Sequence, residues 1–155
     1  MKIIRANLGH IGKIIPLFNA YRMFYQQSSD ILRAEKFITE RLRNSESIIF
    51  LALDEKTPDF PGIGFTQLYL GWGSIGAQRI LTLSDLYVDI EYRKRNIGRL
   101  LVRSAREYAK QEGIEKIYLS TEASNFAGQK LYESEGYIKD TNFINYSLCV
   151  PIEML

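Results

Sequence analysis

The residues best suited to chemistry lie in the segment Arg93–Arg106, which contains six basic residues and no acidic residue. A strand predicted to end at Val88 leads into this segment, and an amphipathic helix is predicted to begin at Ile97. The first turn of a helix has unpaired N–H groups and the positive end of the helix dipole, so it binds phosphate well. Asn96 and Gly98 suit this junction, because Asn tolerates a left-handed backbone and Gly lets the backbone approach a ligand closely. The segment predicts an anion site, although a solvated helix start without a ligand would have a similar composition.

The charge distribution and the absence of two common phosphate-binding motifs indicate which kind of anion site to expect. The formal net charge of +2 combines this basic segment with a remainder of 14 basic and 18 acidic residues, which favours a local site over a basic coat. The sequence contains neither a Gly-x-x-x-x-Gly-Lys-Ser/Thr loop nor a Gly-x-Gly-x-x-Gly fingerprint, so two common phosphate sites are excluded. No aromatic residues alternate with the basic ones for base stacking. We therefore expect a pyrophosphate site of another design and no nucleic-acid partner.

A second stripe of suitable residues lies on a short helix predicted from Asn125 to Glu135. Asn125, Gly128 and Tyr132 are spaced i, i+3 and i+7, so they share one side of that helix. A small residue one turn away from a phenol leaves a groove that suits a slender cofactor arm. Each residue also has a structural alternative, since Asn125 suits a helix N-cap and Tyr132 an interfacial position.

Both segments resemble the GNAT superfamily of acetyl-CoA-dependent N-acetyltransferases. The run Arg93-Lys94-Arg95-Asn96-Ile97-Gly98 resembles the Q/R-x-x-G-x-G/A signature of that family, with Asn96 in place of the first Gly. The strand Asp85–Val88 before it and the segment Thr121–Tyr137 after it resemble the family's strand and its N…A…LYE..GY pattern. Residues 19–30 are similar to a substrate-side element of diamine-acetyltransferase-like members. The resemblance covers most of the chain and is strongest from Leu83 to Tyr137.

The resemblance implies an acetyl-CoA site and direct transfer of the acetyl group to an amine. In this mechanism Tyr132 protonates the leaving thiolate as a general acid, and a free backbone N–H near Val88 stabilises the oxyanion. No metal is expected, because His10 is the only histidine. The expected cofactor-binding residues are Tyr87, Val88, Arg93, Lys94, Arg95, Asn96, Ile97, Gly98, Arg99, Asn125, Gly128 and Tyr132.

Asp85 is the second candidate catalytic residue. The alternation of a strand predicts that it shares one face with Leu81, Leu83 and Tyr87, where a carboxylate is anomalous. It could anchor a cationic amine and assist its deprotonation, or it could be an edge residue or the buried partner of an Arg or Tyr. Glu122 is a further candidate. The acceptor is predicted to be a cationic small molecule or a lysine side chain, and polyamines, amino sugars and lysine peptides fit equally.

The sequence leaves two alternatives to an enzyme. A non-catalytic acyl-CoA-binding regulatory module of the same fold draws support from Asn96, which departs from the family signature. A nucleic-acid-binding domain built on Arg93–Arg106 would bind duplexes with a steep salt dependence. It is disfavoured, because the basic residues occupy only one loop and one side of a helix.

A layered α/β domain is predicted to position these residues. The resemblance implies a single N-acetyltransferase domain over residues 1–155. We expect a GNAT-type mixed, mostly antiparallel sheet flanked by about four helices. After an N-terminal strand, helices are predicted at 11–25, 30–44, 97–109 and 125–135, and strands at 47–53, 63–70, 79–88, 116–121 and 143–150.

The final predicted strand also bears on assembly and location. Residues 143–150 would leave one apolar side available, which suggests a homodimer, and Cys149 would be a small buried hydrophobe there. A single cysteine, no signal-peptide pattern and no apolar run long enough for a bilayer predict a cytoplasmic protein with no membrane partner.

Overall fold

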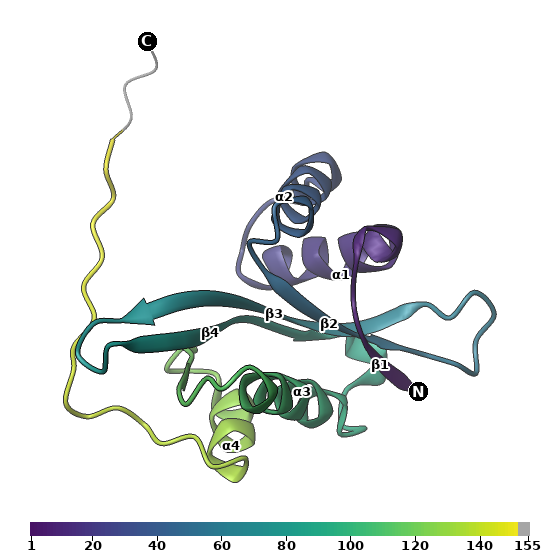
Figure 1. Cartoon of the computed structure of the whole chain (residues 1–155). Coiled ribbons are helices and arrows are strands. Elements are labelled where there is room, and N and C mark those ends of the chain that lie inside the picture. The colour runs from purple at the N-terminus through teal and green to yellow at the C-terminus, as the bar shows by residue number, and fades with distance from the viewer. Residues whose placement is uncertain (152–155) are drawn as a thin grey trace.

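A five-stranded sheet with helices on both faces forms the body of the protein, in a computed structural model that describes residues 1–151 (Figure 1). The strands follow one another across the sheet in chain order, and only the last pair is parallel. They are β1 (Lys2–Arg5), β2 (Ile48–Leu53), β3 (Gly62–Gly73), β4 (Gln78–Val88) and β5 (Ile117–Tyr118). This is the predicted mixed, mostly antiparallel sheet. The last four residues of the predicted domain lie outside the described range.

The helices cover the sheet in two pairs. Helices α1 (Ile11–Phe24) and α2 (Ile31–Arg43) lie on one face, and α3 (Ile97–Gln111) and α4 (Phe126–Ser134) lie on the other. All four agree with the predicted segments to within a few residues at their ends. Asp30 caps α2 by accepting the Arg33 N–H at 2.9 Å.

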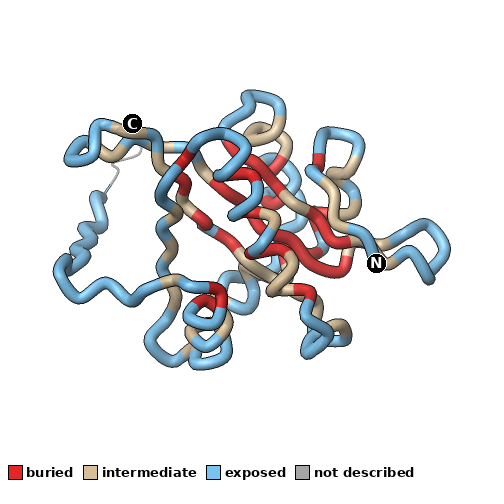
Figure 2. The backbone as a smooth tube through the Cα atoms, turned by 60° about the horizontal axis from the view of Figure 1, so that its bottom comes forward, coloured by how far each residue is buried: buried red, intermediate tan, exposed pale blue. Residues whose placement is uncertain are grey.

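The core has a layer on each side of the sheet, and buried positions run along the strands and the inner sides of the helices (Figure 2). On the α1 side, Ile14 and Phe18 pack with Phe65. On the α3 side, Val102 and Ala105 pack with strand residues, as the 3.6-residue period of that helix predicts. Helices α1 and α3 also pack against β4, the strand that leads into the basic segment.

The C-terminal part of the chain differs from the prediction. Residues 143–150 form no strand and are exposed, so the predicted final strand is wrong, and Cys149 is exposed rather than buried. The predicted strand 116–121 pairs with β4 only at Ile117 and Tyr118. An alternating apolar pattern shows that a segment can join a sheet, but it does not show that an edge of the same chain lies within reach. No helix within residues 1–151 is long and apolar enough to cross a membrane.

Candidate active site

A β-bulge in β4 turns Asp85 toward α1. The register with β3 shifts between the pairs Gln67–Asp85 and Leu68–Leu83, which leaves Ser84 as an extra residue. One extra residue exchanges the two faces of a strand beyond it. Leu83 accordingly packs in the core layer of α3, whereas Asp85 interacts with Tyr21 of α1. The prediction that Asp85 shares a face with Leu81 and Leu83 is therefore wrong, while Tyr87 does share its face.

Beyond the bulge, one edge of β4 is open. Strand β5 pairs only with Leu81 and Thr82. The Asp89 N–H donates to the Ile63 carbonyl at 3.0 Å, and bonded and non-bonded pairs alternate in an antiparallel ladder. The N–H of Val88 therefore points away from β3 and toward this open edge. The Val88 carbonyl accepts the Arg93 Nε–H at 3.0 Å, and the N–H lies where the sequence predicted a free donor.

The start of α3 presents uncapped N–H groups. Asn96 is the N-cap residue with φ 62° and ψ 10°, and its side chain makes no capping bond. The first helical bond runs from the Leu100 N–H to the Asn96 carbonyl, so the N–H groups of the preceding turn have no intrahelical acceptor. Asn is the ordinary residue that adopts this left-handed conformation at little strain. The departure from the family signature at Asn96 is thus compatible with the geometry of the loop.

A cavity of about 810 Å³ lies between these features and collects most of the predicted residues. Of the expected cofactor-binding residues only Arg95 lies outside its lining, because its guanidinium packs over the Tyr92 ring at 5.2 Å. Asp85 is 7% exposed and does not line the cavity either. The predicted residues in the lining are Tyr87, Val88, Arg93, Lys94, Asn96, Ile97, Gly98, Arg99, Asn125, Gly128 and Tyr132, and the others are Tyr21, Phe24, Tyr25, Leu83, Ser84, Leu86, Tyr92, Ser120, Thr121, Glu122, Ala127 and Leu131.

The C-terminal end of α1 forms an aromatic wall of the cavity. Tyr25 packs edge-on against Tyr21 at 5.1 Å and against Phe24 at 5.2 Å between ring centroids. The Arg93 guanidinium lies over Phe24 at 5.7 Å. Burial, and then the charges of Glu122 and Asp85, raise the pKa of Tyr25. This wall falls within residues 19–30, where the resemblance placed a substrate-side element.

Asp85 lies behind this wall in a buried polar cluster. Its carboxylate accepts the Gln67 Nε2–H at 2.5 Å and interacts with the Tyr21 hydroxyl. Burial raises the pKa of Asp85 despite these hydrogen bonds, and burial together with Asp85 raises the pKa of Tyr21. Tyr21 therefore stays protonated and connects the carboxylate to the cavity. The sequence offered an Arg or Tyr as a buried partner of Asp85, and the partner is a tyrosine. It did not single out Tyr21, and it did not offer Gln67, because the bulge that aligns them has no sequence signature.

Helix α4 places Tyr132 in the lining of the cavity, and Asn125 is its N-cap residue. The Asn125 Oδ1 accepts the Gly128 N–H at 3.0 Å, and its Nδ2 donates to the Thr121 Oγ1 at 2.9 Å. A Cβ on Gly128 would lie 2.6 Å from the Asn125 Nδ2, so glycine makes room for this cap. Tyr132 is 9% exposed and packs edge-on against Tyr137 at 5.9 Å. Burial raises the pKa of Tyr132 to about 12.

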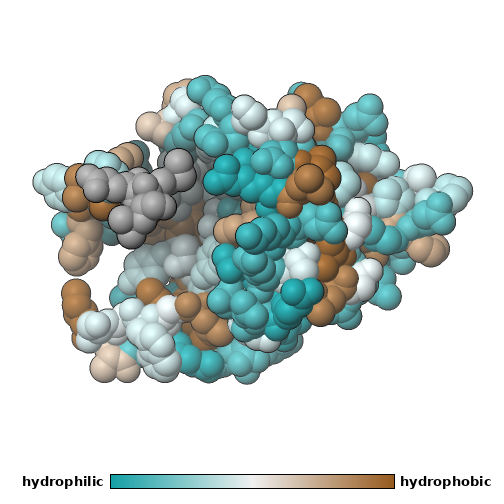
Figure 3. All heavy atoms as spheres, turned by 90° about the horizontal axis from the view of Figure 1, so that it is seen from above, coloured by the Kyte–Doolittle hydropathy of each residue, from teal (hydrophilic) through white to brown (hydrophobic). Residues whose placement is uncertain are grey.

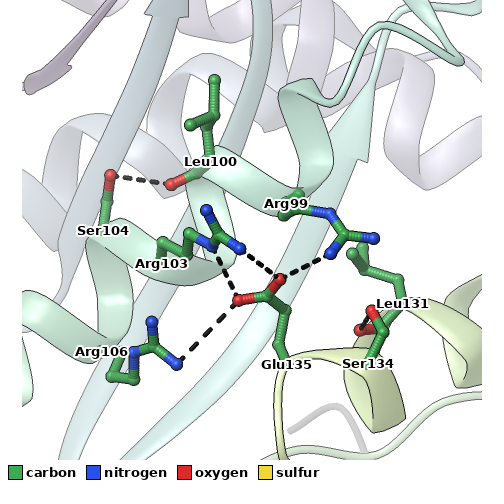
Figure 4. A network of polar contacts seen from close by, with 8 residues as sticks. All are labelled: Arg99, Leu100, Arg103, Ser104, Arg106, Leu131, Ser134 and Glu135. Atoms are coloured by element: carbon green, nitrogen blue, oxygen red, sulfur yellow. Dashed lines mark hydrogen bonds and ion pairs between the residues drawn. The ribbon is translucent and has the colours of Figure 1, made fainter.

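Three arginines of α3 converge on one carboxylate at the end of α4 (Figure 4). Glu135 accepts hydrogen bonds from Arg99 Nη1 at 2.9 Å and from Arg103 Nε and Nη2 at 2.9 and 3.1 Å, with Arg106 Nη1 at 4.0 Å. The hydrogen bond from Arg103 holds the pKa of Glu135 below its usual range. This contact, called the arginine clamp below, was not predicted. The spacing of its arginines on one side of α3 was the available signal for an acidic partner.

The histidine has a local role at the start of α1. The Asn7 N–H donates to the His10 Nδ1 at 3.1 Å, and the Asn7 Oδ1 accepts the Gly9 N–H at 2.9 Å. Across residues 1–151, no three side chains of His, Cys, Asp or Glu form a group that could hold a metal ion.

Comparison with known proteins gives concordant matches. The model of the acetyltransferase (GNAT) family matches residues 14–137. The uncharacterized N-acetyltransferase YhfO of Bacillus subtilis is 43% identical over 151 residues, which are 97% of this chain and 99% of that protein. A probable acetyltransferase of Haemophilus influenzae is 29% identical over 137 residues, 88% of this chain and 90% of its own.

Solved structures share the architecture. The crystal structure of a probable acetyltransferase superposes with a TM-score of 0.89 at 36% identity and covers 99% of this chain and 100% of its own. An aminoglycoside acetyltransferase from an uncultured soil metagenomic sample, in complex with trehalose, has a TM-score of 0.81 at 16% identity and covers 97% and 96%. At that identity the second likeness shows the fold alone.

Proposed function

This chain belongs to the acetyltransferase (GNAT) family and is an acetyltransferase, and we propose that it transfers the acetyl group of acetyl-CoA to a primary amine of a cationic small molecule or a lysine side chain. One observation carries the proposal. The uncapped start of α3, the outward N–H of Val88 and the Tyr132 ring all border one cavity of about 810 Å³. The same cavity therefore offers the start of α3 for anion binding, the Val88 N–H for polarising the carbonyl and Tyr132 for donating a proton.

The residues at the start of α3 fit the pyrophosphate of acetyl-CoA. The N–H groups of Ile97, Gly98 and Arg99 would hold the anion, and Lys94 would add charge beside them. A Cβ on Gly98 would meet only Leu131 at 3.4 Å and Val88 at 3.8 Å, so the protein itself has room for a larger residue. The absence of a side chain there leaves space for the ligand. When bound, acetyl-CoA supplies a thioester carbonyl for attack by the amine.

The Val88 N–H is the proposed donor to the thioester oxygen. It points to the open edge of β4, where β5 pairs only with Leu81 and Thr82. A fixed donor stabilises the negative charge that develops on this oxygen during attack, and one such donor is typically worth about 100- to 1,000-fold in kcat. A backbone donor suits this role because its position is set by the sheet.

Tyr132 is the proposed general acid. Its pKa of about 12 keeps the phenol protonated at physiological pH, so that it can donate a proton to the departing thiolate. Tyr132→Phe should lower kcat by roughly 100- to 10,000-fold with little change in the KM for acetyl-CoA. The matched control is Tyr137→Phe, because the Tyr137 hydroxyl is buried without a hydrogen-bond partner in residues 1–151 and its removal should leave kcat unchanged. An unaltered kcat in Tyr132→Phe would remove Tyr132 from the acid role.

The aromatic wall and the acidic groups near it support a cationic acceptor. Aromatic faces attract cations, and Glu122 lines the same cavity as Tyr21, Phe24 and Tyr25. Asp85 is proposed to act through Tyr21 as a positioning residue. Asp85→Asn should then raise the KM for the amine about tenfold, equal to about 1.4 kcal/mol, with a smaller effect on kcat.

Stability gives an independent readout of Asp85→Asn. Because burial raises the pKa of Asp85, the folded state binds its proton more tightly than the unfolded state does, and that contribution to stability is lost as pH rises through the folded pKa. Near pH 7 the Asn variant should therefore melt at the same or a higher temperature than the wild type. Tyr21→Phe should reproduce the KM effect, and an unchanged KM in both variants would leave Asp85 with a structural role only.

The acceptor needs its own experiment. Incubation with acetyl-CoA and a panel of polyamines, aminoglycosides and lysine peptides, read as release of free thiol, would identify the class of amine. Release with none of these amines would contradict the proposed substrate class. The cytoplasmic location and the exclusion of nucleic acid stay predictions from the sequence.

A further inference from the structure

The side chain of Arg93 turns from the basic loop toward the aromatic wall of the cavity. Its Cζ lies 5.7 Å from the centroid of the Phe24 ring and 5.6 Å from that of the Tyr87 ring. Its Nε–H donates to the Val88 carbonyl at 3.0 Å. These contacts are with α1 and β4, whereas the pyrophosphate is proposed to bind at the start of α3. Because Arg93 also lines the cavity, its charge can serve a second anionic group there.

The outer end of the Arg93 guanidinium has no partner in the described part of the chain. Within residues 1–151 its two Nη groups make no hydrogen bond and no ion pair, in contrast to those of Arg99 and Arg103, which bind Glu135. The Nη groups of an arginine form a planar fork that matches the two oxygens of a carboxylate. Arg93 therefore offers a carboxylate site on the wall of the cavity.

The contact with Val88 places this site beside the reacting carbonyl. Val88 accepts the Arg93 Nε–H through its carbonyl, and its N–H is the proposed donor to the thioester oxygen. The N–H and C=O of one residue point to the same edge of an antiparallel strand, so both lie at the open edge of β4. A carboxylate on Arg93 would then lie close to the carbon that the amine attacks. An α-amino acid fits this short separation, because its amine and its carboxylate are bonded to the same carbon.

The aromatic wall leads from Arg93 toward a carboxylate. Phe24, which lies under the Arg93 guanidinium, packs edge-on against Tyr25 at 5.2 Å. Tyr25 lies close enough to Glu122 for the charge of that residue, after burial, to raise the pKa of its phenol. The wall thus has a guanidinium near one end and a carboxylate near the other. Aromatic faces attract cations, so the end near Glu122 suits a cationic side chain.

The outer surface favours a small acceptor over a docked protein. In the view of Figure 3, hydrophilic residues (teal) predominate on the face that α1 and α2 form, and hydrophobic residues (brown) are scattered among them. Broad apolar patches mark docking sites for proteins, and the described residues show none on this face. The groups that would select the acceptor lie inside the cavity, as in a site for a small molecule.

Building on the acetyl transfer proposed above, we propose that the acceptor is a free basic α-amino acid, with its carboxylate on Arg93 and its cationic side chain along the aromatic wall toward Glu122. The α-ammonium first releases one proton to solvent. The neutral nitrogen then forms a bond to the acetyl carbon, and the C–S bond breaks with its electron pair on sulfur. Tyr132 gives its proton to the sulfur and regains one from the nitrogen through solvent. The products are an Nα-acetyl amino acid and coenzyme A.

The first test asks whether the carboxylate is recognised. L-arginine, L-lysine and L-ornithine are each compared with the corresponding amide, which has the same shape without the charge, and with the decarboxylated amine. For at least one of the three, kcat/KM should exceed that of its amide roughly 100-fold, or by about 2.7 kcal/mol. Thiol release measures the rate, and mass spectrometry should find the acetyl group on the α-nitrogen. Equal rates for every amino acid and its amide, or acetylation of a side-chain amine alone, would overturn the proposal.

The second test asks whether Arg93 is the recognising group. Arg93→Gln should reduce the preference for the amino acid over its amide to about twofold, whereas Arg93→Lys, which keeps the charge without the fork, should retain part of it. The KM for acetyl-CoA should change little in either variant. The matched control is Arg95→Gln, which removes the same charge outside the cavity lining and should keep the full preference. An undiminished preference in Arg93→Gln, or an equal rise in the KM for acetyl-CoA with both acceptors, would overturn the proposal.

The same panel separates failure of this proposal from failure of the proposed acetyl transfer. Thiol release with the amides or the decarboxylated amines, but with none of the amino acids, would overturn the amino-acid acceptor and leave the transfer to an amine standing. Release with none of the compounds, and with none of the polyamines, aminoglycosides and lysine peptides, would contradict the transfer itself and the amino-acid acceptor with it. Circular dichroism of each variant shows whether it is folded.

Discussion

The two halves of the basic segment look alike in the sequence and do different things in the molecule. In the loop half, Arg93 lies over Phe24 and Lys94 lines the cavity. In the helical half, Arg99, Arg103 and Arg106 surround the buried carboxylate of Glu135. Of these residues only Arg99 has both roles, since it lines the cavity and also pairs with Glu135. A count of basic residues therefore does not locate an anion site, because three of these six pair with Glu135 of the same chain.

The largest expected effect comes from the loop half and involves no charge. Gly98→Ala would place a methyl group between Leu131 and Val88, inside the cavity that all three residues line. We expect the KM for acetyl-CoA to rise roughly 100-fold, or about 2.7 kcal/mol. The melting temperature should stay equal or rise, because Ala favours a helix over Gly by up to about 1 kcal/mol.

The matched control for that variant is Gly12→Ala. Gly12 is the second residue of α1, as Gly98 is of α3, and a Cβ there would meet nothing within 4 Å. It should affect stability in the same direction and leave the KM unchanged. Equal KM values in the two variants would show that Gly98 has no contact with the cofactor.

The next prediction compares one charge from each half. Lys94→Gln should raise the KM for acetyl-CoA about tenfold, the effect of losing one hydrogen bond to a charged group, and this effect should weaken as salt is added. Arg103→Gln removes the same charge from the arginine clamp and should leave that KM within about twofold while it lowers the melting temperature. Steady-state kinetics and thermal unfolding of both variants check this, and similar KM values would mean that the two halves are not distinct.

Most helices and strands, and about half of the residues that line the cavity, could be predicted because their signals are local in the sequence. Helix period, caps and strand alternation are local signals, and the start of α3 carries its anion site in contiguous residues such as Asn96 and Gly98. The bulge at Ser84 was not predictable, because one extra residue in a strand depends on its pairing with Gln67 and Leu68. Residues 143–150 were predicted as a strand from alternation alone, which does not say where a free edge lies.

The smallest expected effect tests the arginine clamp itself. Glu135→Gln should lower the melting temperature near pH 7 by several degrees and leave the KM for acetyl-CoA within about twofold, because Glu135 joins α3 to α4 from outside the cavity lining. Since the pKa of Glu135 lies below its ordinary value of 4.5, its contribution to stability is present above that value and is lost as pH falls through the folded pKa. The difference in melting temperature between the wild type and the variant should therefore shrink in acid. A difference that stays constant between about pH 7 and pH 3 would show that the ion pairs do not stabilise the fold, and that the helical half of the segment is held by packing alone.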